Sequence, residues 1–176
     1  MLPLHHGRLF GQGIGVEIRR VNTDEWREYR DIRLAALLDA PDAFGSTYAE
    51  SVARDDAWWI ERTRLSAESD EQAMFLAWSG STVVGLAGTF FDEPDWVVIA
   101  MWVDPAHRGM GLGRRLLDAV IDFQRAQGAT ESVLGVVDGN DAARALYEQY
   151  GFRDNGVANP LREGEPLIVR ELRLKL

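Results

Sequence analysis

The chain has 176 residues, contains no cysteine and carries a net charge of −9. This length predicts one domain with a sizeable hydrophobic core, and the absence of cysteine excludes disulfides, thiolate metal sites and a cysteine nucleophile. The apolar runs are too short to span a bilayer and no signal-peptide pattern opens the chain, so we expect a cytoplasmic protein without a membrane partner. The negative charge argues against nucleic-acid binding and favours a cationic partner such as an amine.

Residues 1–15 lack hydrophobic periodicity and include two adjacent histidines, His5 and His6. Because no further ligands follow at regular spacing, these residues predict a disordered N-terminal arm and not a metal site. The folded domain is therefore expected to comprise residues 16–176, beginning with a strand over residues 16–21.

A helix is expected to follow, because Asn22-x-x-Glu25 has the pattern of a capping box and an amphipathic segment runs from Trp26 to Leu37. Residues 41–51 are neither periodic nor simply polar, and they predict no regular element. Asp55 or Asp56 is expected to cap a second helix, which ends before a polar turn over residues 66–71.

Alternation and turn residues predict the remaining elements. Residues 73–78, 82–91 and 96–103 are expected to form an antiparallel meander. A helix over residues 111–127 ends at Gly128 and leads to a buried strand over residues 132–137, which the helical crossover makes parallel to the preceding strand. The last predicted elements are a helix over 141–150, capped by Asn140, and strands over 151–158 and 168–174. The order indicates an α/β domain.

The loop between the third strand of the meander and its following helix is rich in glycine. Gly109, Gly111 and Gly113 let backbone N–H groups converge at the positive end of a helix, which is a typical anion-binding arrangement. Neither the Walker loop nor the dinucleotide fingerprint fits, because the spacing is Arg108-x-x-Gly111-x-Gly113.

That spacing, after Val103-x-Pro105, resembles the acyl-CoA pyrophosphate loop of the GCN5-related N-acetyltransferase (GNAT) superfamily. A second segment, with Asn140, Ala143, Leu146, Tyr147 and Gly151-Phe152, resembles the superfamily's N-x-x-A-x-x-L-Y-x-x-x-G-F signature. The resemblance implies the GNAT fold: a mixed central sheet of about seven strands, about four helices, and two splayed parallel strands that form the acyl-CoA cleft.

The resemblance also implies acetyl-CoA as donor, a primary amine of a small molecule, peptide or protein as acceptor, no metal, and a monomer or homodimer. The backbone of Met101, Trp102 and Val103 would contact pantetheine, and Asn140, Ala143 and Tyr147 would line the other side of the cofactor. The residues expected around the pyrophosphate are Arg108, Gly109, Met110, Gly111, Leu112, Gly113 and Arg114.

The implied chemistry is attack of a neutral amine on a thioester. Tyr147 occupies the family's tyrosine position and is the predicted acid for the departing thiolate; the alternative is a ring that packs against cofactor or sheet. Strand N–H groups near Trp102 would stabilise the oxyanion. The predicted base is Asp95 or Glu50, with a water chain or no dedicated base as alternatives. Asp95 stands thirteen residues before Arg108, a separation that resembles that of the catalytic glutamate in the histone-acetylating branch of the superfamily.

Arg33-Leu-Ala-Ala-Leu followed by Pro41-x-x-Phe44-Gly-Ser resembles one subgroup of bacterial GNAT proteins. Phe44, Ser46, Tyr48 and Glu50 are therefore the predicted acceptor-pocket residues, and the alternative is a surface connection whose aromatic rings enter the core. The sequence predicts an N-acetyltransferase. A GNAT module that binds acyl-CoA as a sensor or interaction domain, without turnover, is the alternative function.

Overall fold

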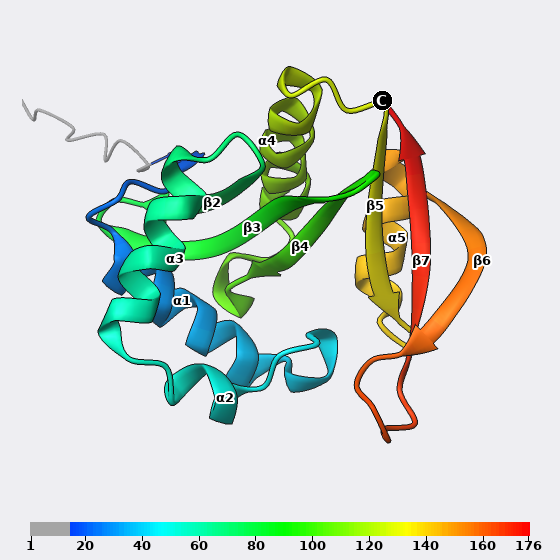
Figure 1. Ribbon diagram of the computed structural model, residues 1–176, viewed down its shortest axis with the longest axis horizontal. Coiled ribbons are helices and arrows are strands. Elements are labelled where there is room, and N and C mark those ends of the chain that lie inside the picture. Colours follow the sequence, from blue (N-terminus) through cyan, green and yellow to red (C-terminus); the bar gives the residue numbers. More distant parts are fainter. Residues whose placement is uncertain (1–14) are drawn as a thin grey trace, which may run out of the picture.

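The computed structural model describes residues 15–176, so the predicted N-terminal arm, apart from Gly15, and its two histidines lie outside the described residues. Figure 1 shows the helices on both sides of one twisted sheet. The elements are β1 (Val16–Arg20), α1 (Trp26–Asp39), η1 (Pro41–Ala43), α2 (Tyr48–Val52), α3 (Asp56–Glu68), β2 (Gln72–Ser79), β3 (Thr82–Asp92), β4 (Asp95–Val103), η2 (Pro105–His107), α4 (Leu112–Ala126), β5 (Glu131–Val137), α5 (Asp141–Tyr150), β6 (Arg153–Pro160) and β7 (Ile168–Lys175).

The strands form one mixed sheet of seven strands in the order β1-β2-β3-β4-β5-β7-β6. β2, β3 and β4 are the predicted antiparallel meander, and α4 carries the chain across to β5, which pairs with β4 in parallel. The predicted α/β architecture is therefore confirmed, with five α-helices in the described part of the chain where about four were expected.

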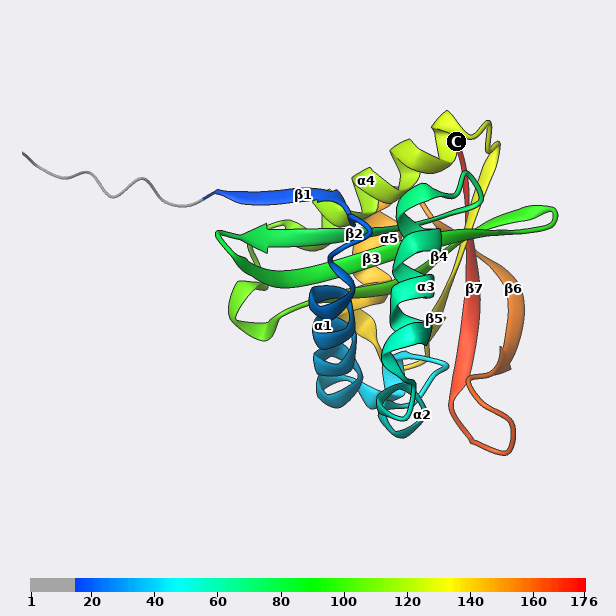
Figure 2. The same ribbon diagram turned by 60° about the vertical axis from the view of Figure 1, so that its left-hand side comes forward.

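Two hydrophobic clusters, one on each face, hold the helices on the sheet. α1 and α3 cover one face and α4 and α5 cover the other, as Figure 2 shows. The buried stripe of α4 consists of Leu112, Leu116, Leu117, Val120 and Ile121. Because each such side chain contributes roughly 1.5–3 kcal/mol when it is fully buried, this stripe fixes the position of α4 and of the glycine loop before it.

β4 and β5 separate soon after they begin. Their pairing covers only Trp96 to Val98 on β4 and Ser132 to Leu134 on β5, although β4 continues to Val103. Ala100 has a φ of +57°, at a register shift between β3 and β4. A bulge of this kind bends and twists its strand, which turns β4 away from β5 and leaves the expected splay between them.

Three local predictions need correction. The segment after α1 contains a short helix, α2, because Thr47 and Glu50 form a complete capping box. The box predicted at Asn22 is incomplete: Glu25 is itself the N-cap of α1, and its carboxylate accepts a hydrogen bond from the Asn22 backbone N–H at 2.8 Å while it pairs with Arg19. Finally, α3 continues to Glu68 and so includes the first three residues of the expected polar turn.

Candidate active site

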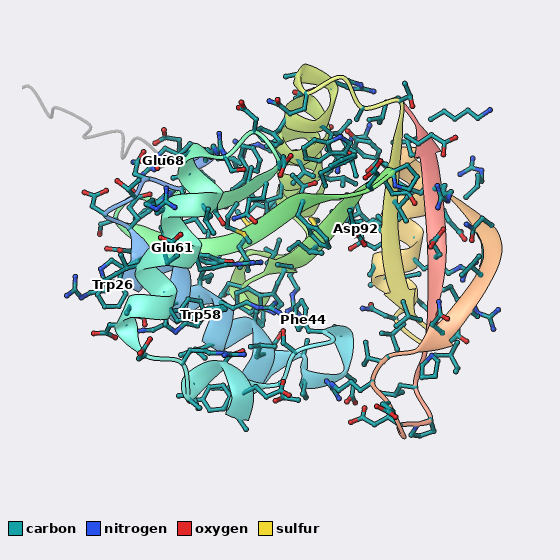
Figure 3. The ribbon with its side chains drawn as sticks, viewed as in Figure 1. Trp26, Phe44, Trp58, Glu61, Glu68 and Asp92 are labelled. Atoms are coloured by element: carbon teal, nitrogen blue, oxygen red, sulfur yellow. The ribbon has the colours of Figure 1, made fainter. Side chains whose placement is uncertain are left out.

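A cavity of about 650 Å³ lies between the α1–α3 side of the molecule and the diverging strands β4 and β5. Figure 3 shows Phe44 and Trp58 among the side chains on the helical side of this region. From the strand side the cavity is lined by residues 97–101 of β4 and 134–137 of β5, and α5 closes one wall. The splay of the sheet therefore opens directly into a space bounded by the helices.

Several of the predicted cofactor residues meet in this cavity. Met101, Asn140, Ala143 and Tyr147 line it, and the Asn140 side chain caps α5 by accepting a hydrogen bond from the Ala143 N–H at 3.3 Å. Trp102 does not line it, because its ring is buried toward α1. The side chain of Trp102 is thus structural, and only its main chain remains available for the predicted contact with pantetheine.

The glycine loop has the backbone geometry of an anion site. Gly109 and Gly111 both have φ +76°, and a Cβ at either position would meet nothing within 4 Å, so the loop is open to a ligand. Gly111 is the N-cap of α4, and the first helical hydrogen bond runs from the Arg115 N–H to the Gly111 carbonyl. The N–H groups of residues 112–114 are therefore unused by the helix and lie at its positive end, which suits a pyrophosphate.

The side chain of Arg108 has a structural partner. Its Nε donates to the Val103 carbonyl at 2.9 Å, and its Nη2 donates to Asp39 at the end of α1. Asp39 also accepts a hydrogen bond from Trp102 Nε1 at 2.9 Å. One carboxylate thus joins α1, β4 and the glycine loop, and its hydrogen bonds from Trp102 and Arg108 lower the pKa of Asp39 below 3.8.

Replacing Asp39 by asparagine is expected to lower the melting temperature at neutral pH. A carboxyl group whose folded-state pKa is lowered stabilises the fold above its unfolded-state pKa and loses this contribution as the pH falls through the lowered value. The difference between wild type and Asp39→Asn should therefore be constant near neutrality and shrink below about pH 4. Thermal unfolding between pH 7 and pH 3 measures it.

Asp31→Asn is the matched control, because Asp31 is an exposed carboxylate of the same helix whose one ion-pair partner among residues 15–176 is its neighbour Arg30. It should show little difference at any pH, since exposed pairs of this kind stabilise weakly. An Asp39→Asn difference that persists unchanged at acid pH would contradict the charge-dependent link.

Tyr147 projects into the cavity from α5. It is 7 % exposed, its ring packs edge-on against Phe152, and its hydroxyl makes no hydrogen bond to any other of residues 15–176. Burial raises the pKa of Tyr147 well above its ordinary value of 10, so the hydroxyl is a neutral donor at physiological pH. The structure therefore places an unengaged O–H at the cavity.

The two predicted bases lie in different places. Glu50 lines the cavity, and its Oε2 accepts hydrogen bonds from the backbone N–H and hydroxyl of Thr47, both at 2.9 Å, which lower the pKa of Glu50. Asp95 lies at the paired end of β4, outside this cavity, where Arg173 binds both of its carboxylate oxygens at 2.8 Å. The position of Asp95 does not support a role as base.

Of the predicted acceptor-pocket residues, likewise, some line the cavity and one does not. Phe44 and Ser46 line the cavity, whereas Tyr48 begins α2 and packs against the core beside α1. Arg162, from the connection between β6 and β7, donates to the carbonyls of Phe44 at 2.9 Å and Gly45 at 3.2 Å. This arginine ties the C-terminal half of the sheet to the acceptor side of the cavity.

Sequence reasoning missed the arginines that line the cavity, which are Arg33, Arg54 and Arg62. A signal existed for one of them. Arg33 stands four residues after Tyr29 and four before Leu37, both of which are buried, so it occupies the buried stripe of α1. An arginine on such a stripe needs either a partner or a ligand. Arg54 gave no comparable signal, because it lies in the connection between α2 and α3, outside a helix.

Within residues 15–176 no helix is both long enough and apolar enough to cross a membrane. The same part of the chain contains no group of three or more histidine, aspartate or glutamate side chains arranged to hold a metal ion.

The sequence is similar to those of known acetyltransferases. The N-alpha-acetyltransferase RimI of Mycobacterium tuberculosis is 38% identical over 107 residues, which are 58% of this chain and 66% of RimI. A mycothiol acetyltransferase of Beutenbergia cavernae is 32% identical over 188 residues, covering 84% of this chain and 61% of that protein. The chain thus spans about two thirds of the length of these two relatives.

The fold is shared with solved acetyltransferase structures. A GNAT-family acetyltransferase from Streptococcus pneumoniae superposes with a TM-score of 0.79 at 20% identity, covering 92% of this chain and 100% of that one. The family model described as the acetyltransferase (GNAT) family matches residues 20–152, which include the glycine loop and the segment around Tyr147. The chain therefore belongs to the acetyltransferase (GNAT) family.

Proposed function

We propose that the protein is an acetyl-CoA-dependent N-acetyltransferase that acts on a primary amine. The observation that carries this proposal is the cavity itself, where the splayed strands, the α5 residues Asn140 and Tyr147, and the acceptor-side Glu50 meet. A sensor or interaction module that binds acyl-CoA without turnover would need only the cofactor site, and no site for an acceptor. The unengaged hydroxyl of Tyr147 beside the opening for an acceptor supports turnover.

The residues present fit acetyl-CoA as donor. A family neighbour of known structure, yncA of Salmonella typhimurium, is described with its cofactor acetyl-CoA and superposes with a TM-score of 0.70 at 24% identity, covering 92% of this chain and 94% of that one. In this chain the backbone of residues 109–114 would hold the pyrophosphate, that of residues 101–103 the pantetheine, and Asn140 and Ala143 the opposite side. Bound there, acetyl-CoA would supply a thioester carbonyl that an amine attacks with release of the thiol.

The side chains of the cavity account for the protons. An alkylamine with a pKa of about 10.4 is neutral in only about one molecule in 10³ at pH 7, so the acceptor must lose a proton. Glu50 is the carboxylate that lines the cavity, and its lowered pKa keeps it ionised, so it attracts the ammonium, whose proton leaves through water to the solvent. Tyr147 donates to the sulfur as the carbon–sulfur bond breaks, and strand N–H groups near the Ala100 bulge stabilise the oxyanion.

The acceptor class is wider than any one relative indicates. RimI is named for N-alpha-acetylation and the second relative for mycothiol acetylation, so the acceptor of this chain is an amine of a small molecule, peptide or protein. A cytoplasmic location and a monomeric or homodimeric state stay predictions from the sequence.

Release of thiol from acetyl-CoA, detected with a thiol-reactive dye across a panel of amines, amino acids, polyamines, aminoglycosides and peptides, tests the proposal. The chain has no cysteine, so every thiol detected comes from CoA. Release stimulated by one amine class is the expected result. A rise in melting temperature with acetyl-CoA but no release of thiol with any amine would favour the sensor. The absence of both the rise and the release would contradict the acetyl-CoA site.

A further inference from the structure

The acceptor end of the cavity is positively charged, although the protein as a whole is acidic. Among residues 15–176, the titratable side chains that line the cavity are two tyrosines together with Arg33, Arg54, Arg62 and Glu50, which give a net charge of +2 in a chain of net charge −9. None of the three arginines is within 4.0 Å of a carboxylate oxygen among residues 15–176. The charge inside the cavity therefore differs in sign from the charge that the whole sequence presents.

Arg33 is the most buried of these arginines. Its Nη2 donates to the Ser46 hydroxyl at 2.8 Å, and its guanidinium lies 4.5 Å from the centre of the Phe44 ring. Its Nη1 is buried and has no hydrogen-bond partner in the described part of the chain. Burial, together with the nearby charge of Arg62, lowers the pKa of Arg33. A buried cation with an unused donor is costly unless a ligand supplies the missing anion.

A second unused donor occurs on the same cavity. Trp59 is 2 % exposed, lines the cavity from α3, and its indole Nε1 has no hydrogen-bond partner among residues 15–176. Guanidinium and indole N–H groups are donors only. Both donor atoms lie behind the surface of the cavity, so they show that its lining carries more hydrogen-bond donors than acceptors as well as a net positive charge. A carboxylate bound in the cavity would supply the missing negative charge.

We propose that Arg33, with Arg62 beside it, binds a carboxylate of the acceptor, so that the substrate is a primary amine that also carries a free carboxylate, such as an amino acid. This inference rests on the proposed function. The planar fork of a guanidinium matches the two oxygens of a carboxylate. Glu50, on the same cavity, attracts the ammonium end, so the two ends of a zwitterion are held by opposite charges and the amine is oriented for transfer.

The carboxylate is assigned to the acceptor and not to the acyl group of the donor because of where the arginines lie. Arg33 belongs to α1, Arg62 to α3 and Arg54 to the connection before α3. The groups that suit the donor come instead from β4, α4 and α5. A carboxylate on the acyl group, as in succinyl-CoA, is the competing source of the same chemistry, and the experiment separates the two.

The test compares L-amino acids with their α-amides as acceptors, because each pair shares an amine and differs in the carboxylate. In the wild type, kcat/KM for the acid should exceed that for the amide by about 10- to 100-fold, the effect of one charge-assisted hydrogen-bonded pair. Arg33→Gln should bring the ratio of kcat/KM for the acid to kcat/KM for the amide close to one, and Arg33→Lys should restore part of the preference for the acid. Arg27→Gln, on the exposed face of the same helix, is the control that keeps the preference.

Arg62→Gln provides an independent variant if Arg33→Gln does not fold, and it should reduce the preference several-fold. Binding is measured without turnover as the rise in melting temperature that each amino acid or amide causes in the presence of CoA. The rise should require both the free carboxylate and Arg33.

The possible failures are distinguishable. Equal use of acids and amides would overturn the carboxylate site while the transferase stands. A preference for succinyl-CoA over acetyl-CoA that disappears in Arg33→Gln would assign the carboxylate to the donor and overturn the inference. Carboxylate-dependent stabilisation without thiol release from any amine would support the site and refute the proposed function.

Discussion

Tyr147→Phe is expected to lower kcat by roughly 100-fold or more, the usual cost of removing a general acid or a donor to developing charge. The affinity for acetyl-CoA should be little changed, because the ring and its edge-on contact with Phe152 are retained. The hydroxyl alone is removed, and it is the group that the structure leaves unengaged on the cavity. Steady-state thiol release and direct binding of acetyl-CoA separate the two quantities.

The pH profile sharpens this prediction. The rate should rise with pH as the acceptor amine loses its proton, and it should not fall on the alkaline side until above about pH 10, because burial raises the pKa of Tyr147 above that of a free tyrosine. A tyrosine of ordinary pKa would begin to lose its proton sooner. The wild-type profile therefore tests the environment of the hydroxyl independently of the variant.

Tyr150→Phe is the matched control. Tyr150 lies three residues further along α5, does not line the cavity, and donates a hydrogen bond to Asp118 at 2.9 Å. Loss of this hydrogen bond in Tyr150→Phe should lower the free energy of unfolding by about 0.5–1.5 kcal/mol and leave kcat unchanged. If Tyr147→Phe turned over at the wild-type rate with the same pH profile, Tyr147 would be a packing residue and not the acid.

The parts of the site that could be predicted from sequence are those encoded locally. A strand, a glycine loop and a helix follow one another within residues 95–126, and Asn140 caps the helix that carries Tyr147. Each of these features depends on the conformational preferences of neighbouring residues, such as glycines with positive φ and an asparagine at an N-cap. The local sequence therefore predicts the strand, the glycine loop and the two helices on the proposed donor side of the site.

The acceptor side could not be predicted in this way because it is assembled from distant segments. Asp95 is paired with Arg173, which is 78 residues away in the chain, so the local sequence gives no sign of this contact. The connection after η1 is held by Arg162, and Arg33 faces the cavity only because α1 packs beside α3. The bulge at Ala100 could not be predicted from the sequence either, since alanine does not favour a positive φ and only the surrounding sheet enforces this conformation.

Gly111→Val is expected to weaken acetyl-CoA binding by about 100-fold, equivalent to the loss of about two hydrogen bonds to a charged group. Gly111 has φ +76°, and its missing Cβ leaves open space at the start of α4. A β-branched side chain there both strains the left-handed backbone and projects into the space where the pyrophosphate is proposed to bind. Equilibrium binding of acetyl-CoA measures the effect, with the melting temperature recorded in parallel.

Gly128→Val separates backbone strain from ligand exclusion. Gly128 follows the C-terminal end of the same helix, with φ +82° and equally open surroundings, so it lies away from the proposed pyrophosphate site at the N-terminal end. Both variants should lose about 1–2 kcal/mol of stability, since an L-residue with a side chain is strained in this conformation. Only Gly111→Val should lose acetyl-CoA. If both variants bound it equally well, the N-terminus of α4 would not be the pyrophosphate site, and the donor would have to be held by the splayed strands alone.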